Sequence, residues 1–121
     1  MEGEIREFLE GSGFPPAAPG EDRVVRVPLP DIGDLAIDIS RENYPCIYVL
    51  VPVEHPSIEF LLRGFWLCDP ARSVGNVLHF IGDGETRVGF LIALTKSRFR
   101  ASSLTAALTQ ILGAVVRQQQ R

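Results

Sequence analysis

The side chains that could do chemistry in this sequence are few, and their spacing matches no catalytic site. His55 and His79 have no metal-ligating partner at a recognisable spacing, and His79 falls on an apolar strand pattern. Cys46 or Cys68 beside His79 would make a nucleophile and a base. Both cysteines lie in apolar stretches, however, and an activated thiol needs an electropositive, partly exposed setting. We therefore predict no catalytic residue and no enzyme.

The acidic residues also fall short of a site for a metal or a cofactor. Three aspartates occupy a turn and a strand pattern, where we expect solvated carboxylates: Asp31, Asp34 and Asp38. Residues 82–84 (Gly-Asp-Gly) begin like a dinucleotide fingerprint, but the third glycine is absent and the stretch joins two strand patterns. Asp83 and Glu85 supply too few oxygens for a calcium loop. We expect no metal and no cofactor.

The composition is that of an ordinary folded protein, and we expect one domain over residues 1–121. The chain is 45% hydrophobic and 22% charged, with a formal net charge of −3. This charge argues against nucleic acid as the partner, because phosphate binding needs a surplus of Lys and Arg. Basic residues do gather at Lys96, Arg98 and Arg100. We expect a solvated connection there, and an anionic partner is the alternative.

The sequence shows no signal for export and no membrane span. Glu2, Glu4 and Glu7 make the N-terminus acidic, and no apolar run approaches the ~20 residues that cross a bilayer. The longest run, residues 46–53, has the length of a strand and contains Pro52. We expect the two cysteines to be buried free thiols, which suits a reducing compartment. These observations predict a cytoplasmic protein.

Residues 75–96 form the pattern around which the other elements are arranged. In the second half of this stretch, alternate residues are apolar and fall on one face of a strand: Val88, Phe90, Ile92 and Leu94. The residues between them are mostly small or polar. Residues 82–84 favour a tight reversal, because glycine takes a positive φ cheaply. We predict a hairpin at the centre of an antiparallel sheet.

The whole chain is predicted to be an α+β fold with a five-stranded antiparallel sheet, in the order helix, three strands, helix, two strands, helix. Residues 14–22 form a stiff, Pro-rich connector, and Pro28 and Pro30 indicate that the first strand lies at an edge. Ser102 or Ser103 is expected to cap the last helix, which frays into solvent from Gln118 onward. The other elements are expected at residues 2–11, 23–29, 35–39, 46–53, 56–67, 77–81 and 88–95, with Pro56 at the first position of the middle helix.

Two stretches have more apolar residues than a domain of this size covers. The strand at 46–53 is apolar on both faces, so it is either central and covered on both sides or open to another chain. The middle helix is apolar nearly all round and must be buried on more than one side. We therefore predict a homodimer, with an interface that includes Phe60, Leu61, Phe65, Trp66 and Leu67.

Surplus apolar residues at the N-terminal end predict an extended polypeptide as partner. Such a partner would gain main-chain hydrogen bonds along a sheet edge and would place alternate side chains in pockets. The residues that we predict to contact it lie in the first helix and the first two strands: Ile5, Phe8, Leu9, Val24, Val25, Ala36 and Ile37.

The chain resembles the class I type III secretion chaperones, which are small, acidic proteins. The resemblance lies first in the order of the elements. The most similar residue patterns are those of residues 75–80, the turn at 82–84, the strand at 88–94 and the closing stretch 104–115 (LTAALTQILGAV). It implies a homodimeric, non-enzymatic chaperone whose middle helix helps to make the interface, and which holds an extended segment of a secretion effector. The early interruption at Asp69-Pro70 and the long connector depart from the family. A regulatory or protein-interaction domain of the same fold, without a secretion client, is the alternative.

Overall fold

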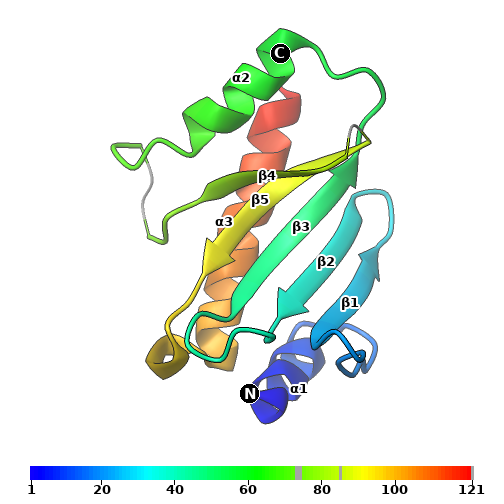
Figure 1. Cartoon of the computed structure of the whole chain (residues 1–121), viewed down its shortest axis with the longest axis vertical. Helices are drawn as coiled ribbons and strands as arrows, with labels where there is room; N and C mark the ends of the chain where they lie inside the picture. Colours follow the sequence, from blue (N-terminus) through cyan, green and yellow to red (C-terminus); the bar gives the residue numbers. More distant parts are fainter. Residues whose placement is uncertain (73–74, 85, 121) are drawn as a thin grey trace.

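A computed structural model describes residues 1–72, 75–84 and 86–120 of the chain. The elements follow the predicted order, with one short 3₁₀ turn added at Lys96–Arg98. Figure 1 shows their arrangement. They are α1 (Glu2–Gly11), β1 (Val24–Leu29), β2 (Gly33–Asp38), β3 (Cys46–Pro52), α2 (Ile58–Leu67), β4 (His79–Asp83), β5 (Arg87–Ala93) and α3 (Ala101–Gln119).

The five strands form one antiparallel sheet in the order β1-β2-β3-β5-β4. The edge position of β1 is as Pro28 indicated. The hairpin is not the centre of the sheet, which corrects the prediction. β4 is an edge strand, and β3 lies in the middle, because β5 pairs with both β3 and β4. The turn of the hairpin uses Gly84, whose φ is +65°.

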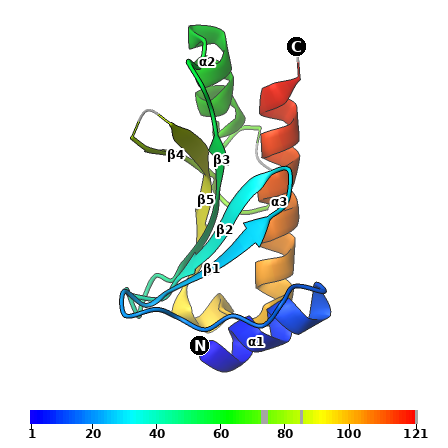
Figure 2. The same ribbon diagram turned by 90° about the vertical axis from the view of Figure 1, so that its right-hand side faces the viewer.

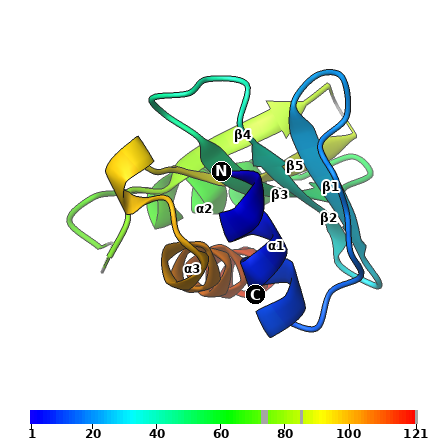
Figure 3. The same cartoon turned by 90° about the horizontal axis from the view of Figure 1, so that it is seen from below.

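Helices α1 and α3 cover one face of the sheet, and the other face has no helix over it (Figures 1 and 2). Seen from below, α1 lies beside α3 on the same side (Figure 3). The core lies between these helices and the sheet. The predicted apolar face of β5 is buried here as expected, and the strand residues of the core include Val25, Ile37, Ile47, Val49, Phe90 and Ile92.

Two helices begin at other residues than the sequence predicted. Ser57 is the N-cap of α2, and its hydroxyl oxygen accepts a hydrogen bond from the backbone N–H of Phe60 at 3.1 Å. Pro56 therefore lies before the cap and not at the first helical position. α3 starts at Ala101 after Arg100, which makes no side-chain cap. Ser102 and Ser103 lie inside its first turn and do not cap it.

Candidate functional site

The outer face of α2 carries several of the exposed large apolar residues of the described chain. We define it by four residues at spacings of one, three and four, which place them on one side of the helix: Ile58, Leu62, Phe65 and Trp66. Between 52% and 76% of each side chain is exposed. Single exposed apolar residues are ordinary, but a continuous patch marks an interaction site.

The predicted interface residues divide between this face and the core. Phe65 and Trp66 belong to the outer face, Phe60 and Leu61 are half-buried, and Leu67 is buried against the core. Leu67 is 8% exposed, so it offers a second subunit little surface, and its place in an interface stays a prediction. Ile58 and Leu62 were missed from the set, although the spacing of four from Ile58 to Leu62 and again from Leu62 to Trp66 could have identified them.

Aromatic side chains connect the outer face of α2 to the sheet. The Phe65 ring packs edge-on against the Phe80 ring of β4, with 5.0 Å between the ring centroids. The Phe80 ring in turn packs against the buried Phe90 ring of β5, with 5.5 Å between the centroids. Such pairs favour a defined ring orientation beyond the area that they bury. At the other end, the Arg72 guanidinium stacks over the Trp66 ring at 3.9 Å. These contacts favour defined orientations for the exposed rings of Phe65 and Trp66.

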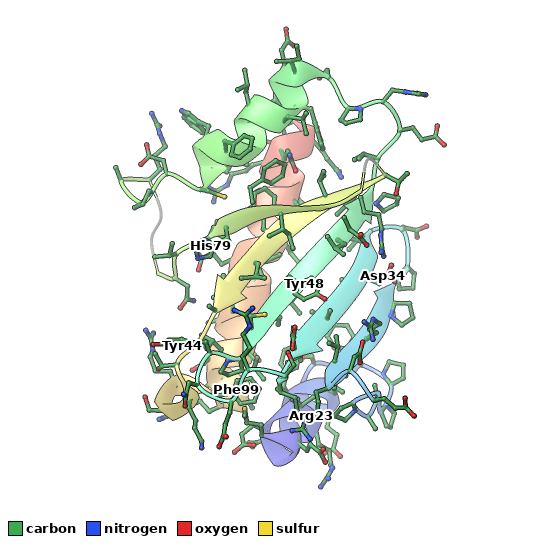
Figure 4. The ribbon with its side chains drawn as sticks, viewed as in Figure 1. Arg23, Asp34, Tyr44, Tyr48, His79 and Phe99 are labelled. Carbon is green, nitrogen blue, oxygen red and sulfur yellow. The ribbon has the colours of Figure 1, made fainter. Side chains whose placement is uncertain are left out.

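The uncovered face of the sheet is less apolar than the outer face of α2. One row across it contains Ala36, Tyr48, Leu91 and His79, and Figure 4 shows Tyr48 in mid-sheet and His79 at the start of β4. Tyr48 and Leu91 are half-buried by their neighbours, and burial raises the pKa of the Tyr48 hydroxyl. β3 is thus central, with a helix over one face only.

Ion pairs lie at the ends of this uncovered face. Arg26 pairs with Asp22 at 2.7 Å, and the Asp22 carboxylate is held charged because its hydrogen bond to Arg26 lowers its pKa. Arg87 of β5 contacts Asp83 of β4 and lies 3.8 Å from Asp34 of β2. These carboxylates balance the two arginines, so the face offers no basic surface to an anionic partner.

The residues predicted to contact a partner polypeptide are all buried in the structure. Phe8, Val25 and Ile37 are core residues with at most 1% exposure, and Val24 and Ala36 are buried too although they lie on the uncovered side of the sheet. The chain's own fold therefore accounts for the burial of these side chains, and their contact with a partner stays a prediction. Ile5 and Leu9 are also buried, but they line a groove of about 340 Å³ between α1 and residues 16–19 of the Pro-rich connector.

The chemically versatile residues do not assemble into a site. β5 separates the strands that carry Cys46 and His79. Cys46 and Cys68 are free, half-buried thiols. Burial raises the pKa of Cys46 from 9.0 to about 11 and also raises the pKa of Cys68, so both thiols stay protonated at neutral pH and are poor nucleophiles.

No group of three His, Cys, Asp or Glu side chains in the described part of the chain could hold a metal ion. Asp34 is 3.8 Å from Arg87, and Asp38 accepts a hydrogen bond from the backbone N–H of Ser40 at 2.8 Å. Glu85, considered above as a calcium ligand, lies outside the described residues. Within residues 1–72, 75–84 and 86–120, no helix is both long and apolar enough to cross a membrane.

Comparisons of the sequence with known proteins find no relative: no protein-family model matches it, and no curated protein matches it. Comparison of the structures does find relatives. The chain is similar to a chaperone in the HopA1–SchA chaperone–effector complex, at 9% identity and a TM-score of 0.74, over 98% of this chain and 93% of the other.

It is also similar to the Yersinia pestis type III secretion chaperone SycH, solved in complex with a stable fragment of YscM2. The identity is 14% and the TM-score 0.70, over 95% of this chain and 96% of the other. YbjN of E. coli, described as a candidate transcription regulator, shares the fold at 15% identity and a TM-score of 0.65, over 93% and 86% of the two chains. The fold is therefore one that type III secretion chaperones have.

Proposed function

We propose that this chain is a non-enzymatic, homodimeric chaperone that binds an extended segment of a type III secretion effector in the cytoplasm. The observation that carries the proposal is the outer face of α2, an ordered apolar surface on a fold that SchA and SycH share. Four large apolar side chains left in water on one helix are best explained by a partner that covers them.

The partner that suits this face best is a second copy of the chain. Most homo-oligomers are two-fold dimers, in which the same patch from each subunit meets itself. A helix with a continuous apolar side, such as α2, can pack along its own copy by interdigitating side chains. The Phe65–Phe80 contact and the Arg72–Trp66 stacking support this packing, because they order the aromatic rings before association.

Sedimentation equilibrium at micromolar concentration tests the dimer. We expect about twice the 13.3 kDa mass of one chain, and we expect Phe65→Glu to give monomers, because an unpaired charge in an apolar interface is costly. Tyr44→Glu is the matched control: Tyr44 is as exposed as Phe65 but lies in the loop before β3, far from α2 (Figure 4). A wild-type chain that stays monomeric would contradict the dimer.

For the effector, the groove beside α1 is better supported than the free edge of β1. The carbonyl of Arg23 bonds to β2, so the backbone groups of Val24, Arg26 and Pro28 point outward. The connector already bonds to both backbone groups of Val24, through Gly20 and Asp22. Pro28 has no N–H to donate. A strand added at this edge would therefore find few partners.

The groove offers an apolar floor and charged sides instead. The groove is lined by Ile5 and Leu9, which are at most 2% exposed, by residues 16–19 of the connector, and by Glu2, Arg6 and Glu10 of α1. An extended effector segment would place apolar side chains on this floor. Because a disordered segment loses conformational entropy on binding, its affinity must come from a long apolar contact.

Calorimetry tests this contact with the N-terminal segment of an effector encoded beside this chain. We expect a clearly negative heat-capacity change and a weak dependence on salt. Leu9→Asp would damage the core, so Ala18→Asp, at an exposed position of the groove, is the better variant and should weaken binding. A steep salt dependence with little heat-capacity change would point to residues 96–100 and an anionic partner, and the chaperone proposal would fall.

The second candidate is a regulatory or protein-interaction domain without a secretion client, which the likeness to YbjN favours. The gene next to this one separates the candidates: a secretion effector supports the chaperone, and its absence supports the regulator. With a net charge of −3, neither candidate is expected to bind nucleic acid, and a gel-shift assay with duplex DNA should show no complex.

A further inference from the structure

The C-terminal end of α3 is tied to α2, although the sequence predicted that it frays into solvent. Gln118 is only 3% exposed, and it is the one polar residue among the buried residues of the described chain. The Arg63 guanidinium of α2 donates hydrogen bonds to the backbone carbonyls of Gln118, at 2.7 Å, and of Gln120. Arg121 lies outside the described residues. The last turn of α3 is therefore a contact surface.

The two helices exchange hydrogen bonds in both directions. Arg63 of α2 reaches the carbonyls of α3, and the side-chain amide of Gln118 donates to the backbone carbonyl of Phe60 in α2 at 3.2 Å. The last carbonyls of a helix have no partner within it and carry partial negative charge. A guanidinium placed there satisfies two of them at once and complements that charge. We call this pair of contacts the α2–α3 clamp.

The clamp matters because α2 buries few residues in the rest of the chain. Along α2, the buried residues are Gly64 and Leu67. A Cβ atom on Gly64 would lie 2.7 Å from the Gln118 side chain and 2.7 Å from the Phe80 ring, so the helix lies unusually close to both. With so few buried residues, the hydrogen bonds of the clamp are a large share of the contacts that hold α2 on the chain. Hydrogen bonds are directional, so they restrict the orientation of the helix beyond what its apolar contacts set.

We infer that Arg63 and Gln118 are positioning residues, which set the orientation of α2 and thereby the surface that its outer face presents to a second copy of the chain. This inference rests on the proposed dimer. It adds that α3, whose first turns lie under the opposite end of the sheet, controls the interface through its last turn (Figure 2). Neither residue has to touch the second copy for its loss to weaken association.

Three substitutions test the clamp. Arg63→Met keeps the length and apolar stem of the side chain but removes the donors, and Gln118→Leu removes the return hydrogen bond. Arg117→Met is the matched control. It makes the same Arg-to-Met change at an exposed position of α3, one residue before Gln118. The first readout is the dimer dissociation constant from sedimentation. We expect Arg63→Met to associate about tenfold more weakly or worse, because hydrogen bonds from a charged group are among the strong ones, and we expect a smaller loss for Gln118→Leu, whose hydrogen bond joins uncharged groups.

Amide hydrogen exchange supplies a readout that a general loss of stability would not give. Loss of the clamp should speed exchange in α2 and leave β3 and β5 protected, whereas loss of overall stability speeds exchange everywhere. Arg63→Lys, which keeps the charge but not the forked donors, should fall between Arg63→Met and wild type. Clamp variants that dimerise as tightly as Arg117→Met, or that lose protection equally in sheet and α2, overturn the inference.

The dimer and the clamp fail in distinguishable ways. A wild-type chain that remains monomeric refutes the proposed dimer, and the same result removes the role of the clamp in association. A wild-type dimer that survives both clamp substitutions refutes the positioning role alone and leaves the proposed function intact.

Discussion

Helices α1 and α2 are both ten residues long, yet the structure treats their apolar side chains in opposite ways. α1 buries all three of its large apolar residues, Ile5, Phe8 and Leu9, to 2% exposure or less. α2 leaves the four residues of its outer face in water. The contrast does not come from helix length, so it must come from the residue pattern and from the surface that each helix meets.

The residue patterns set the first difference. α1 gathers its apolar residues on one stripe and places glutamates and an arginine around the rest, so one contact suffices to cover the stripe. α2 is apolar around most of its circumference, and among the described elements it packs mainly against α3 and the edge strand β4. One side is covered and the other is not. We propose that a second copy of the chain completes the cover of α2, whereas the chain itself covers the apolar stripe of α1.

The largest expected effect is on α1. Phe8→Ala should lower the free energy of unfolding by about 3–5 kcal/mol, because Phe8 is only 1% exposed and removal of its ring leaves a cavity in the core. Urea unfolding followed by circular dichroism measures the change. Phe65→Ala is the matched substitution on α2, and it should cost the monomer only about 0.5–1.5 kcal/mol, the value of its aromatic contact with Phe80. Equal losses from the two variants would break the comparison.

The next effect concerns how closely α2 approaches its neighbours. Gly64→Ala places a methyl group against the Phe80 ring, which cannot retreat because Phe65 and Phe90 pack on it, and we expect the added crowding to cost about 1–3 kcal/mol. Gly113→Ala in α3 is the control: no atom lies within 4 Å of its new Cβ, so it should stabilise the chain by about 1 kcal/mol through helix propensity. Thermal melts compare the two. A Gly64→Ala chain as stable as Gly113→Ala would mean that α2 is free to shift.

A smaller effect is expected at the start of α2. Ser57→Ala removes the cap of Phe60 N–H and should cost about 1 kcal/mol. Because α2 is thinly attached, hydrogen exchange should rise in its first turn before it rises in the sheet. Ser102→Ala, in the first turn of α3 where no side-chain cap is formed, is expected to change the free energy of unfolding by at most about 0.5 kcal/mol.

The smallest effect is chemical and leaves stability unchanged. With the Cys46 pKa at about 11, only about one Cys46 thiol in a thousand is ionised at pH 8. At the ordinary pKa of 9.0, about one in ten would be ionised. Alkylation of the native chain at pH 8 should therefore be about 100-fold slower at Cys46 than in the unfolded chain, and it should accelerate as the pH rises toward 11. Single Cys46→Ala and Cys68→Ala variants assign the rates. Rapid alkylation of Cys46 in the native chain would show that β3 is more open than its burial indicates.

Much of this structure follows from residue patterns that act locally. Alternation along β5 determined which of its side chains enter the core, and helical spacing identified α1 and α2 within two residues of their ends. The prolines near Pro28 identified β1 as an edge, because a residue without an N–H cannot sit inside a ladder. The relation to type III secretion chaperones was also visible in the order of the elements, because the order is a property of the chain alone.

Tertiary structure decided what depends on neighbours distant in sequence. Alternation states which side chains share a face but not which strand lies beside which, so the hairpin seemed central although β3 holds the middle of the sheet. The apolar residues of α1, β1 and β2 were expected to contact a partner, and in the structure the chain's own fold buries them. From the sequence, Gln118 at the end of a helix is expected to be solvated. In the structure, Arg63, 55 residues earlier in the chain, donates a hydrogen bond to its carbonyl. The free face of α2 likewise exists because the fold offers that helix one side to pack against and no second one.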